Sequence, residues 1–215
     1  MRVRVKIEGL RDVATAQAIA ALGADAIGLV LAPSPRRVSI AQAAAIAQAL
    51  PPWVSSVGVF VNAPLPEVNA AAADIGLDYV QLHGDETPEF ASAVAARVIK
   101  AFRIRDERWA DEVSKWVGGY SGQNLRAVLL DAYDPAARGG TGRRFNWQWI
   151  SDARAAGLLA SLPPIILAGG LDPACVADAI KHVQPWGVDV ASGVESAPGV
   201  KDMDKVKAFI TAAGV

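Results

Sequence analysis

Two carboxylates stand at the ends of short apolar runs and could carry acid–base chemistry. Glu8 follows the run 3–7, and Asp131 directly follows the run 127–130. If both runs are parallel strands of one closed sheet, their carboxyl ends meet at the same mouth, where the two side chains face each other. Such a pair suits the movement of protons between neighbouring carbon and oxygen atoms. The alternative is that one of them is a solvated loop acid, but the apolar run before Asp131 favours a functional role.

Small residues follow the last two apolar runs of the chain. Gly169 and Gly170 come after the run 164–168, and Ser192 and Gly193 come after 187–191. Glycine lets the backbone approach a ligand closely, and backbone N–H groups after the last two strands of a barrel commonly bind phosphate. One such pair alone is better explained as a tight turn. Two pairs at successive strands favour a phosphate site.

The elements that must position these residues are strands and helices in alternation. We expect strands over 3–7, 26–31, 56–61, 78–82, 98–102, 127–130, 164–168 and 187–191, and helices over 12–22, 39–50, 64–75, 87–95, 105–116, from 146, from 172 and over 202–213. Eight strand–helix pairs without a break in composition predict an α/β fold, a (βα)8 TIM barrel in which residues 1–215 form a single domain. An open doubly wound sheet is the alternative, but its glycine-rich phosphate turn after the first strand is lacking at Glu8-Gly9-Leu10.

Composition excludes several classes of function. The net charge of the 215 residues is -1, so we expect no nucleic-acid partner, because phosphate-backbone binding needs a clustered basic excess. Cys175 is the single cysteine, which excludes an intrachain disulfide and a cysteine-rich zinc site, and we expect it just inside the helix from 172 as a packed small residue. No apolar run reaches the roughly 18 residues of a membrane span. We therefore expect a cytoplasmic protein without a membrane partner.

Nine short motifs occur in order along the whole chain. They are VKIEGL at 5–10, GADAIG at 23–28, PSPRRVS at 33–39, VGVFVN at 57–62, VQLHGDE at 80–86, LLDA at 129–132, GGTG at 139–142, LAGGL at 167–171 and VDVASGVE at 188–195. Together they resemble the phosphoribosylanthranilate isomerase family from end to end. One position departs from the family pattern, since Glu8 stands where the family has its catalytic cysteine.

The resemblance implies an enzyme of tryptophan biosynthesis. Its reaction would be an Amadori rearrangement of N-(5-phosphoribosyl)anthranilate to 1-(2-carboxyphenylamino)-1-deoxyribulose 5-phosphate, without cofactor or metal. Asp131 would be the general acid, a residue at position 8 the base, and Arg36 the partner of the anthranilate carboxylate. The phosphate end would comprise Asp189 and the amides around Gly142, Gly169, Gly170, Ser192 and Gly193. The only partner expected is the phosphosugar substrate, with the protein a monomer or homodimer.

The replacement at position 8 leaves three hypotheses. Glu8 can act as the base, because a glutamate with an ordinary pKa of about 4.3 is already ionised at neutral pH. It can instead impair or abolish the activity, because glutamate is longer than cysteine and a misplacement of about 1 Å can cost roughly 100-fold in rate. The third hypothesis is an isomerase of another phosphosugar on the same scaffold. A non-catalytic binding protein is disfavoured by the presence of Asp131, and His83 is left between a substrate-facing and a structural role.

Overall fold

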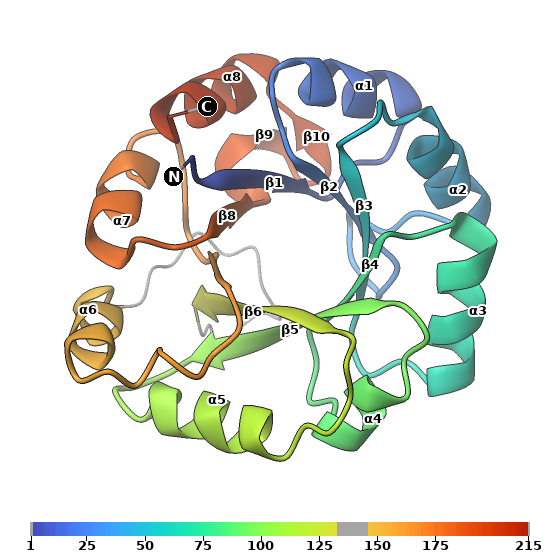
Figure 1. Ribbon diagram of the computed structural model, residues 1–215. Coiled ribbons are helices and arrows are strands. Elements are labelled where there is room, and N and C mark those ends of the chain that lie inside the picture. Colours follow the sequence, from blue (N-terminus) through green and yellow to red (C-terminus); the bar gives the residue numbers. More distant parts are fainter. Residues whose placement is uncertain (1, 133–145, 215) are drawn as a thin grey trace.

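The computed structural model describes residues 2–132 and 146–214, which form a closed barrel of eight parallel strands (Figure 1). Successive strands are neighbours in the barrel, and β1 pairs with β8 to close it, with Arg4 opposite Gly187 and Ile7 opposite Val190. The strands are β1 Arg4–Glu8, β2 Ala26–Val30, β3 Ser55–Phe60, β4 Tyr79–Leu82, β5 Arg97–Ile104, β6 Leu125–Ala132, β7 Ile165–Leu167 and β8 Gly187–Val190. The predicted (βα)8 barrel is confirmed.

Helices surround this barrel, one after each strand (Figure 1). They are α1 Val13–Ala21, α2 Ile40–Ala49, α3 Leu65–Ile75, α4 Pro88–Ser92, α5 Trp109–Gly118, α6 Gln148–Ala155, α7 Val176–Val183 and α8 Met203–Ala212. The side chains of Asp12, Ser39 and Asp202 accept hydrogen bonds from the backbone N–H groups that open α1, α2 and α8, as their N-cap positions require. Within 2–132 and 146–214, no helix is long and apolar enough to cross a membrane.

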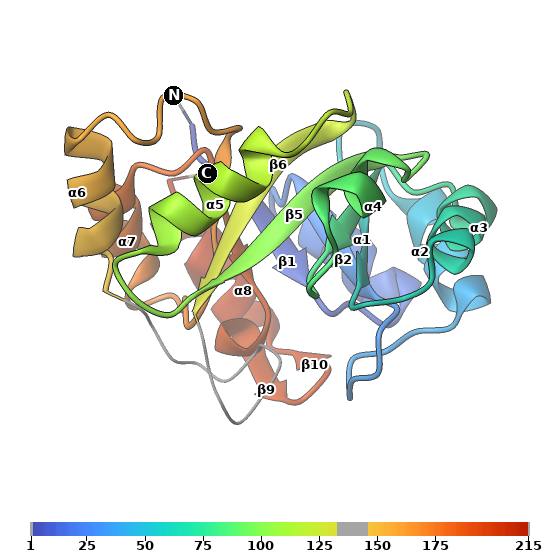
Figure 2. The ribbon, with the colours of Figure 1, turned by 90° about the horizontal axis from the view of Figure 1, so that it is seen from below.

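The end of the barrel differs from the sequence prediction in two places. The helix expected from Asp172 begins only at Val176, because the Asp172 carboxylate accepts from the N–H groups of Ala174 and Cys175 and so caps a preceding turn. Cys175 is therefore the N-cap of α7 and not a residue inside it. A 3-10 turn, η1 Ser192–Val194, and an unpredicted hairpin, β9 Glu195–Ala197 with β10 Val200–Lys201, stand between β8 and α8. The hairpin projects from the barrel on the side away from the chain's N-terminus (Figure 2).

The alternation of side chains along each strand divides the interior into two layers. Residues two apart share a face of a strand, and the inward set in the lower layer is apolar. It comprises Val57, Ile99, Ala101, Ala127, Leu129, Ile166 and Ala168. Above it the inward positions turn polar, and this buried upper layer includes Lys6, Gln81, Asp131 and Asp189. The outward residues form the larger core between the barrel and its helices. The polar layer thus lies between the apolar inward layer and the open end of the barrel.

Candidate active site

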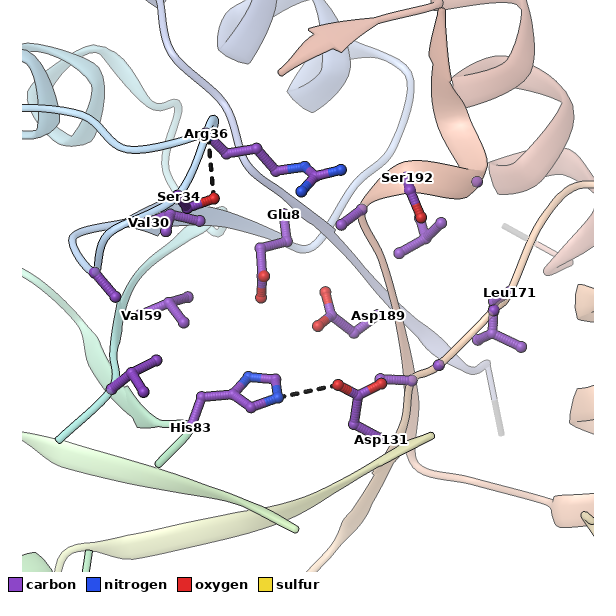
Figure 3. A pocket seen from close by; sticks show the side chains of 18 of the residues that line it. Glu8, Val30, Ser34, Arg36, Val59, His83, Asp131, Leu171, Asp189 and Ser192 are labelled. Carbon is purple, nitrogen blue, oxygen red and sulfur yellow. Dashed lines mark hydrogen bonds and ion pairs between the residues drawn. The ribbon is translucent and has the colours of Figure 1, made fainter. Parts of the chain in front are cut away.

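A pocket of about 290 Å³ opens above the polar layer, where the strands end (Figure 3). Its lining includes every predicted site residue that the structure describes, namely Glu8, Arg36, Asp131, Gly169, Gly170, Asp189, Ser192 and Gly193. Gly142 lies outside the described residues. The two carboxylates expected to face each other, Glu8 and Asp131, both line this pocket from opposite parts of the barrel (Figure 3).

Glu8 shares one buried cation with Asp189. The Lys6 ammonium lies 2.7 Å from Glu8 Oε2 and 3.0 Å from Asp189 Oδ1. Lys6 and Glu8 are two residues apart on β1 and therefore point to the same side, while Asp189 comes from the adjacent β8. Sequence reasoning missed Lys6, although this alternation was a signal that could have found it. One ammonium thus serves two carboxylates whose side chains point toward one another (Figure 3).

This arrangement separates the pKa values of the two carboxyl groups. Burial alone would raise the pKa of Glu8, but the charge of Lys6 and the hydrogen bond from Lys6 outweigh it and lower the pKa to about 2. Burial raises the pKa of Asp189 to about 7, and the charge of Glu8 adds to this rise against the opposing effect of Lys6. Of the two carboxyl groups, Glu8 is therefore the one that stays ionised, whereas Asp189 holds a proton more tightly.

A glycine on the neighbouring strand makes room for Glu8. Gly28 is the register partner of Glu8 on β2, and a Cβ atom at position 28 would lie 2.8 Å from Glu8 Cγ. A carbon that close is a steric clash, so the glutamate stem occupies space that a larger residue at position 28 would take. The side chain at position 8 accordingly reaches into the pocket and does not fold away from it (Figure 3).

Asp131 is held by a histidine. His83 Nε2 lies 3.0 Å from Asp131 Oδ2, and His83 Nδ1 lies 3.0 Å from the amide nitrogen of Gln81. Gln81 Nε2 also lies 3.2 Å from Glu8 Oε2. The sequence left His83 between two interpretations, and the structure places its ring in the pocket wall against the predicted acid (Figure 3). Gln81 was not singled out from the sequence.

Arg36 is anchored by a residue that sequence analysis did not assign. Glu195 on the β9–β10 hairpin accepts from Arg36 Nε at 2.8 Å and from Nη2 at 2.7 Å, and it also pairs with Lys201 at 2.9 Å. The hydrogen bonds that Arg36 donates to Glu195 raise the pKa of Arg36. Gly9 makes room for the arginine stem, because a Cβ at that position would lie 2.7 Å from Arg36 Cδ. The guanidinium is therefore fixed at the pocket rim before any ligand arrives.

The glycines after β7 and β8 are required by the packing of the backbone. Gly169 has φ +85°, and a Cβ there would lie 2.3 Å from the backbone nitrogen of Ala132. A Cβ at Gly193 would lie 1.9 Å from the carbonyl oxygen of Leu171. No other residue type fits these two contacts, so both loops expose bare backbone to the pocket.

The sequence raised two further questions about the chemistry of the site, namely the role of Cys175 and the presence of metal ligands. Cys175 is buried at the start of α7 and is not part of the pocket lining, so it does not take the place of a thiol at position 8. In the parts of the chain that the structure describes, no group of three or more His, Cys, Asp or Glu side chains is placed to hold a metal ion.

Comparison with known proteins identifies the family to which this barrel belongs. A family model described as N-(5'-phosphoribosyl)anthranilate isomerase matches residues 5–212. The chain belongs to the phosphoribosylanthranilate isomerase family. A phosphoribosylanthranilate isomerase of Geotalea uraniireducens is 51% identical over 209 residues, which cover 96% of both chains. The family resemblance inferred from the sequence motifs is thereby confirmed.

Solved phosphoribosylanthranilate isomerases have the same fold. The crystal structure of the Thermotoga maritima enzyme superposes with a TM-score of 0.87 at 37% identity, covering 99% of this chain and 98% of that one. A second crystal structure of a phosphoribosylanthranilate isomerase, in complex with reduced 1-(o-carboxyphenylamino)-1-deoxyribulose 5-phosphate, superposes with a TM-score of 0.83 at 36% identity and the same coverage. The likeness extends over essentially the full length of each isomerase.

Proposed function

We propose that this chain catalyses the Amadori rearrangement of N-(5-phosphoribosyl)anthranilate to 1-(2-carboxyphenylamino)-1-deoxyribulose 5-phosphate in tryptophan biosynthesis. The observation that carries the proposal is the single pocket that holds Asp131, Glu8 and Arg36 together with the glycine loops. The substrate has a sugar ring oxygen, an acidic carbon, a carboxylate and a phosphate, and each has a matching group in that pocket. We further expect a single-domain cytoplasmic protein that is a monomer or a homodimer.

The chemistry begins with the opening of the ribose ring. Asp131 gives its proton to the ring oxygen, the bond from that oxygen to C1 breaks, and the nitrogen lone pair forms a C1=N iminium. Glu8 then removes the proton from C2, and the electron pair of that C–H bond forms C1=C2 while the iminium electrons return to nitrogen. The resulting enolamine becomes the ketone when C1 gains a proton and the C2 hydroxyl loses one. Protons are only moved, so no redox cofactor enters.

The two ends of the substrate have separate anchors. Glu195 takes up Arg36 Nε and one hydrogen of Nη2, which leaves both hydrogens of Nη1 and one of Nη2 for the anthranilate carboxylate. The backbone N–H groups around Gly169, Gly170, Ser192 and Gly193 are our candidates for the phosphate site. The family resemblance implies that Asp189 belongs to the phosphate end of the site. An ionised carboxylate repels a phosphate, so we expect Asp189 to bind the sugar hydroxyl groups beside it.

A steady-state assay tests the proposal. The substrate is generated in situ from anthranilate and phosphoribosyl pyrophosphate, and its loss is followed by fluorescence. We expect turnover by the wild-type chain. A silent wild type whose activity is restored by Glu8→Cys would contradict the proposal and identify Glu8 as a lesion in an otherwise intact site.

We expect Arg36→Lys to raise KM by about 10- to 100-fold with a much smaller change in kcat. A lysine keeps the charge but loses the planar fork, and a hydrogen bond to a charged group contributes about 1.5–3 kcal/mol. Steady-state kinetics measure the effect, and Arg37→Lys, at the exposed neighbouring arginine, is the matched control. An unchanged KM in Arg36→Lys would exclude Arg36 as the carboxylate anchor.

A further inference from the structure

A line of hydrogen bonds runs along the polar layer at the base of the pocket and connects the two candidate catalytic carboxylates. It runs from Glu8 through Gln81 and His83 to Asp131 with separations of 3.2, 3.0 and 3.0 Å. Gln81 and His83 are two residues apart and therefore lie on the same side of the chain at β4. Gln81 is completely buried, and His83 and Asp131 are nearly so. Water therefore has little access with which to replace these contacts.

The orientation of the Gln81 amide is imposed by Glu8. Its nitrogen carries two hydrogens and meets two acceptors, Glu8 Oε2 and His83 Nδ1. The reversed amide would bring its carbonyl oxygen against the ionised carboxylate of Glu8. Gln81 Oε1 is buried without a hydrogen-bond partner among the described residues, which disfavours this orientation. The two contacts of the amide nitrogen are what hold the side chain in this orientation.

That orientation determines where His83 carries its proton. An amide nitrogen can only donate, so His83 Nδ1 must accept, and the ring proton is on Nε2. Nε2–H then donates to Asp131 Oδ2. With Oδ2 engaged as an acceptor, the acid proton of Asp131 resides on Oδ1.

We propose that Gln81 is a positioning residue that fixes the tautomer of His83 and thereby selects the oxygen of Asp131 that delivers the acid proton. The catalytic part of this inference rests on the proposed function. Because one amide contacts both Glu8 and His83, a single side chain orients the base at one end and the acid at the other. Gln81 acts entirely through these neighbours and needs no contact with the substrate.

The tautomer can be read directly by long-range ¹H–¹⁵N correlation spectra of the full chain. The protein has two histidines, and the second provides an internal reference. His182 is exposed, and its Nδ1 lies 2.7 Å from the carbonyl oxygen of Asp178, which can only accept, so its proton is on Nδ1. We expect the opposite pattern for His83, with Nδ1 unprotonated and Nε2 protonated. A proton on His83 Nδ1 in the wild type would overturn the proposal.

Gln81→Met tests the cause, because methionine has a similar volume but no amide. We expect the His83 tautomers to mix, the His182 signals to stay unchanged, and kcat to fall by about 10- to 100-fold with little change in KM. If Gln81→Met does not fold, Gln81→Asn is the second variant, because the shorter side chain cannot bring its amide to both Glu8 and His83. We expect the same mixing of His83 tautomers and the same decrease in kcat. An unchanged His83 spectrum, or a changed spectrum with unchanged kcat, would refute the proposal.

Different measurements would contradict the proposed function and the proposed role of Gln81. A wild-type chain without turnover contradicts the proposed function. The His83 spectrum requires no activity, so it tests the orientation imposed by Gln81 independently of that assay.

Discussion

Replacing Asp131 with asparagine is expected to lower kcat by about 10²- to 10⁴-fold, the range typical for the loss of general acid–base catalysis. Asparagine keeps the volume of the side chain, and its carbonyl oxygen can still accept the hydrogen bond from His83. It carries no acidic proton for the ring oxygen, so ring opening should become the slow step. Steady-state kinetics, together with thermal unfolding to establish that the variant is folded, measure the effect.

The matched control is Asp74→Asn, at an exposed position of α3, which should leave both kcat and KM unchanged. If Asp131→Asn retained kcat within about tenfold of the wild type, below the range for a lost acid, another group would have to protonate the ring oxygen. The assignment of Asp131 would then be wrong.

Removing the carboxylate at position 8 should have an effect of similar size. We expect Glu8→Ala to lower kcat by about 10²- to 10⁴-fold, because the C2 proton then loses its acceptor. The same change should lower the pKa of Asp189, since the charge of Glu8 raises it and Lys6 would be left to Asp189 alone. The decrease in rate is measured in the steady-state assay, with Glu67→Ala on the exposed face of α3 as the control.

The pH dependence of kcat distinguishes a carboxylate base from a thiolate. Because the pKa of Glu8 is about 2, wild-type turnover should show no loss from protonation of Glu8 between about pH 5 and 9. In Glu8→Cys the activity should rise with pH as the thiol, with an ordinary pKa near 8.5, ionises. If Glu8→Ala remained active while Asp189→Asn lost activity, Asp189 would be the proton acceptor in place of Glu8.

The barrel could be predicted because each local signal agreed with the fold. Apolar runs predicted the strands, and the helices expected from Asp12, Ser39 and Asp202 have these three residues as their N-caps. At Asp172 the same kind of signal failed, because aspartate caps an isolated turn as readily as a helix, and the helix expected from position 172 begins only at Val176. The short antiparallel hairpin after β8 has only three and two residues in its strands, too few for a recognisable pattern.

Which residues gather at the pocket followed from strand ends, but their partners did not. Alternation could have placed Lys6 beside Glu8 and Gln81 beside His83, since the members of each pair are two residues apart, along β1 and at the end of β4. Nothing in a single sequence indicates that Glu195 binds Arg36, because the two are 159 positions apart and meet only through the closed barrel. The pKa values depend on these partners and on burial, so they too required the three-dimensional structure.

The closure of the barrel by β1 and β8 has a consequence for the synthesis of the protein itself on the ribosome. The ribosome synthesises Lys6 and Arg36 early. The carboxylates with which they pair, Asp189 and Glu195, are synthesised more than 150 residues later. Until β8 leaves the ribosome, the edge of β1 is unpaired and the Arg36 guanidinium lacks its anchor. The site is thus completed only after β8 and the β9–β10 hairpin have been synthesised. A chain truncated before β8 loses the counter-charges of its own active site along with a strand.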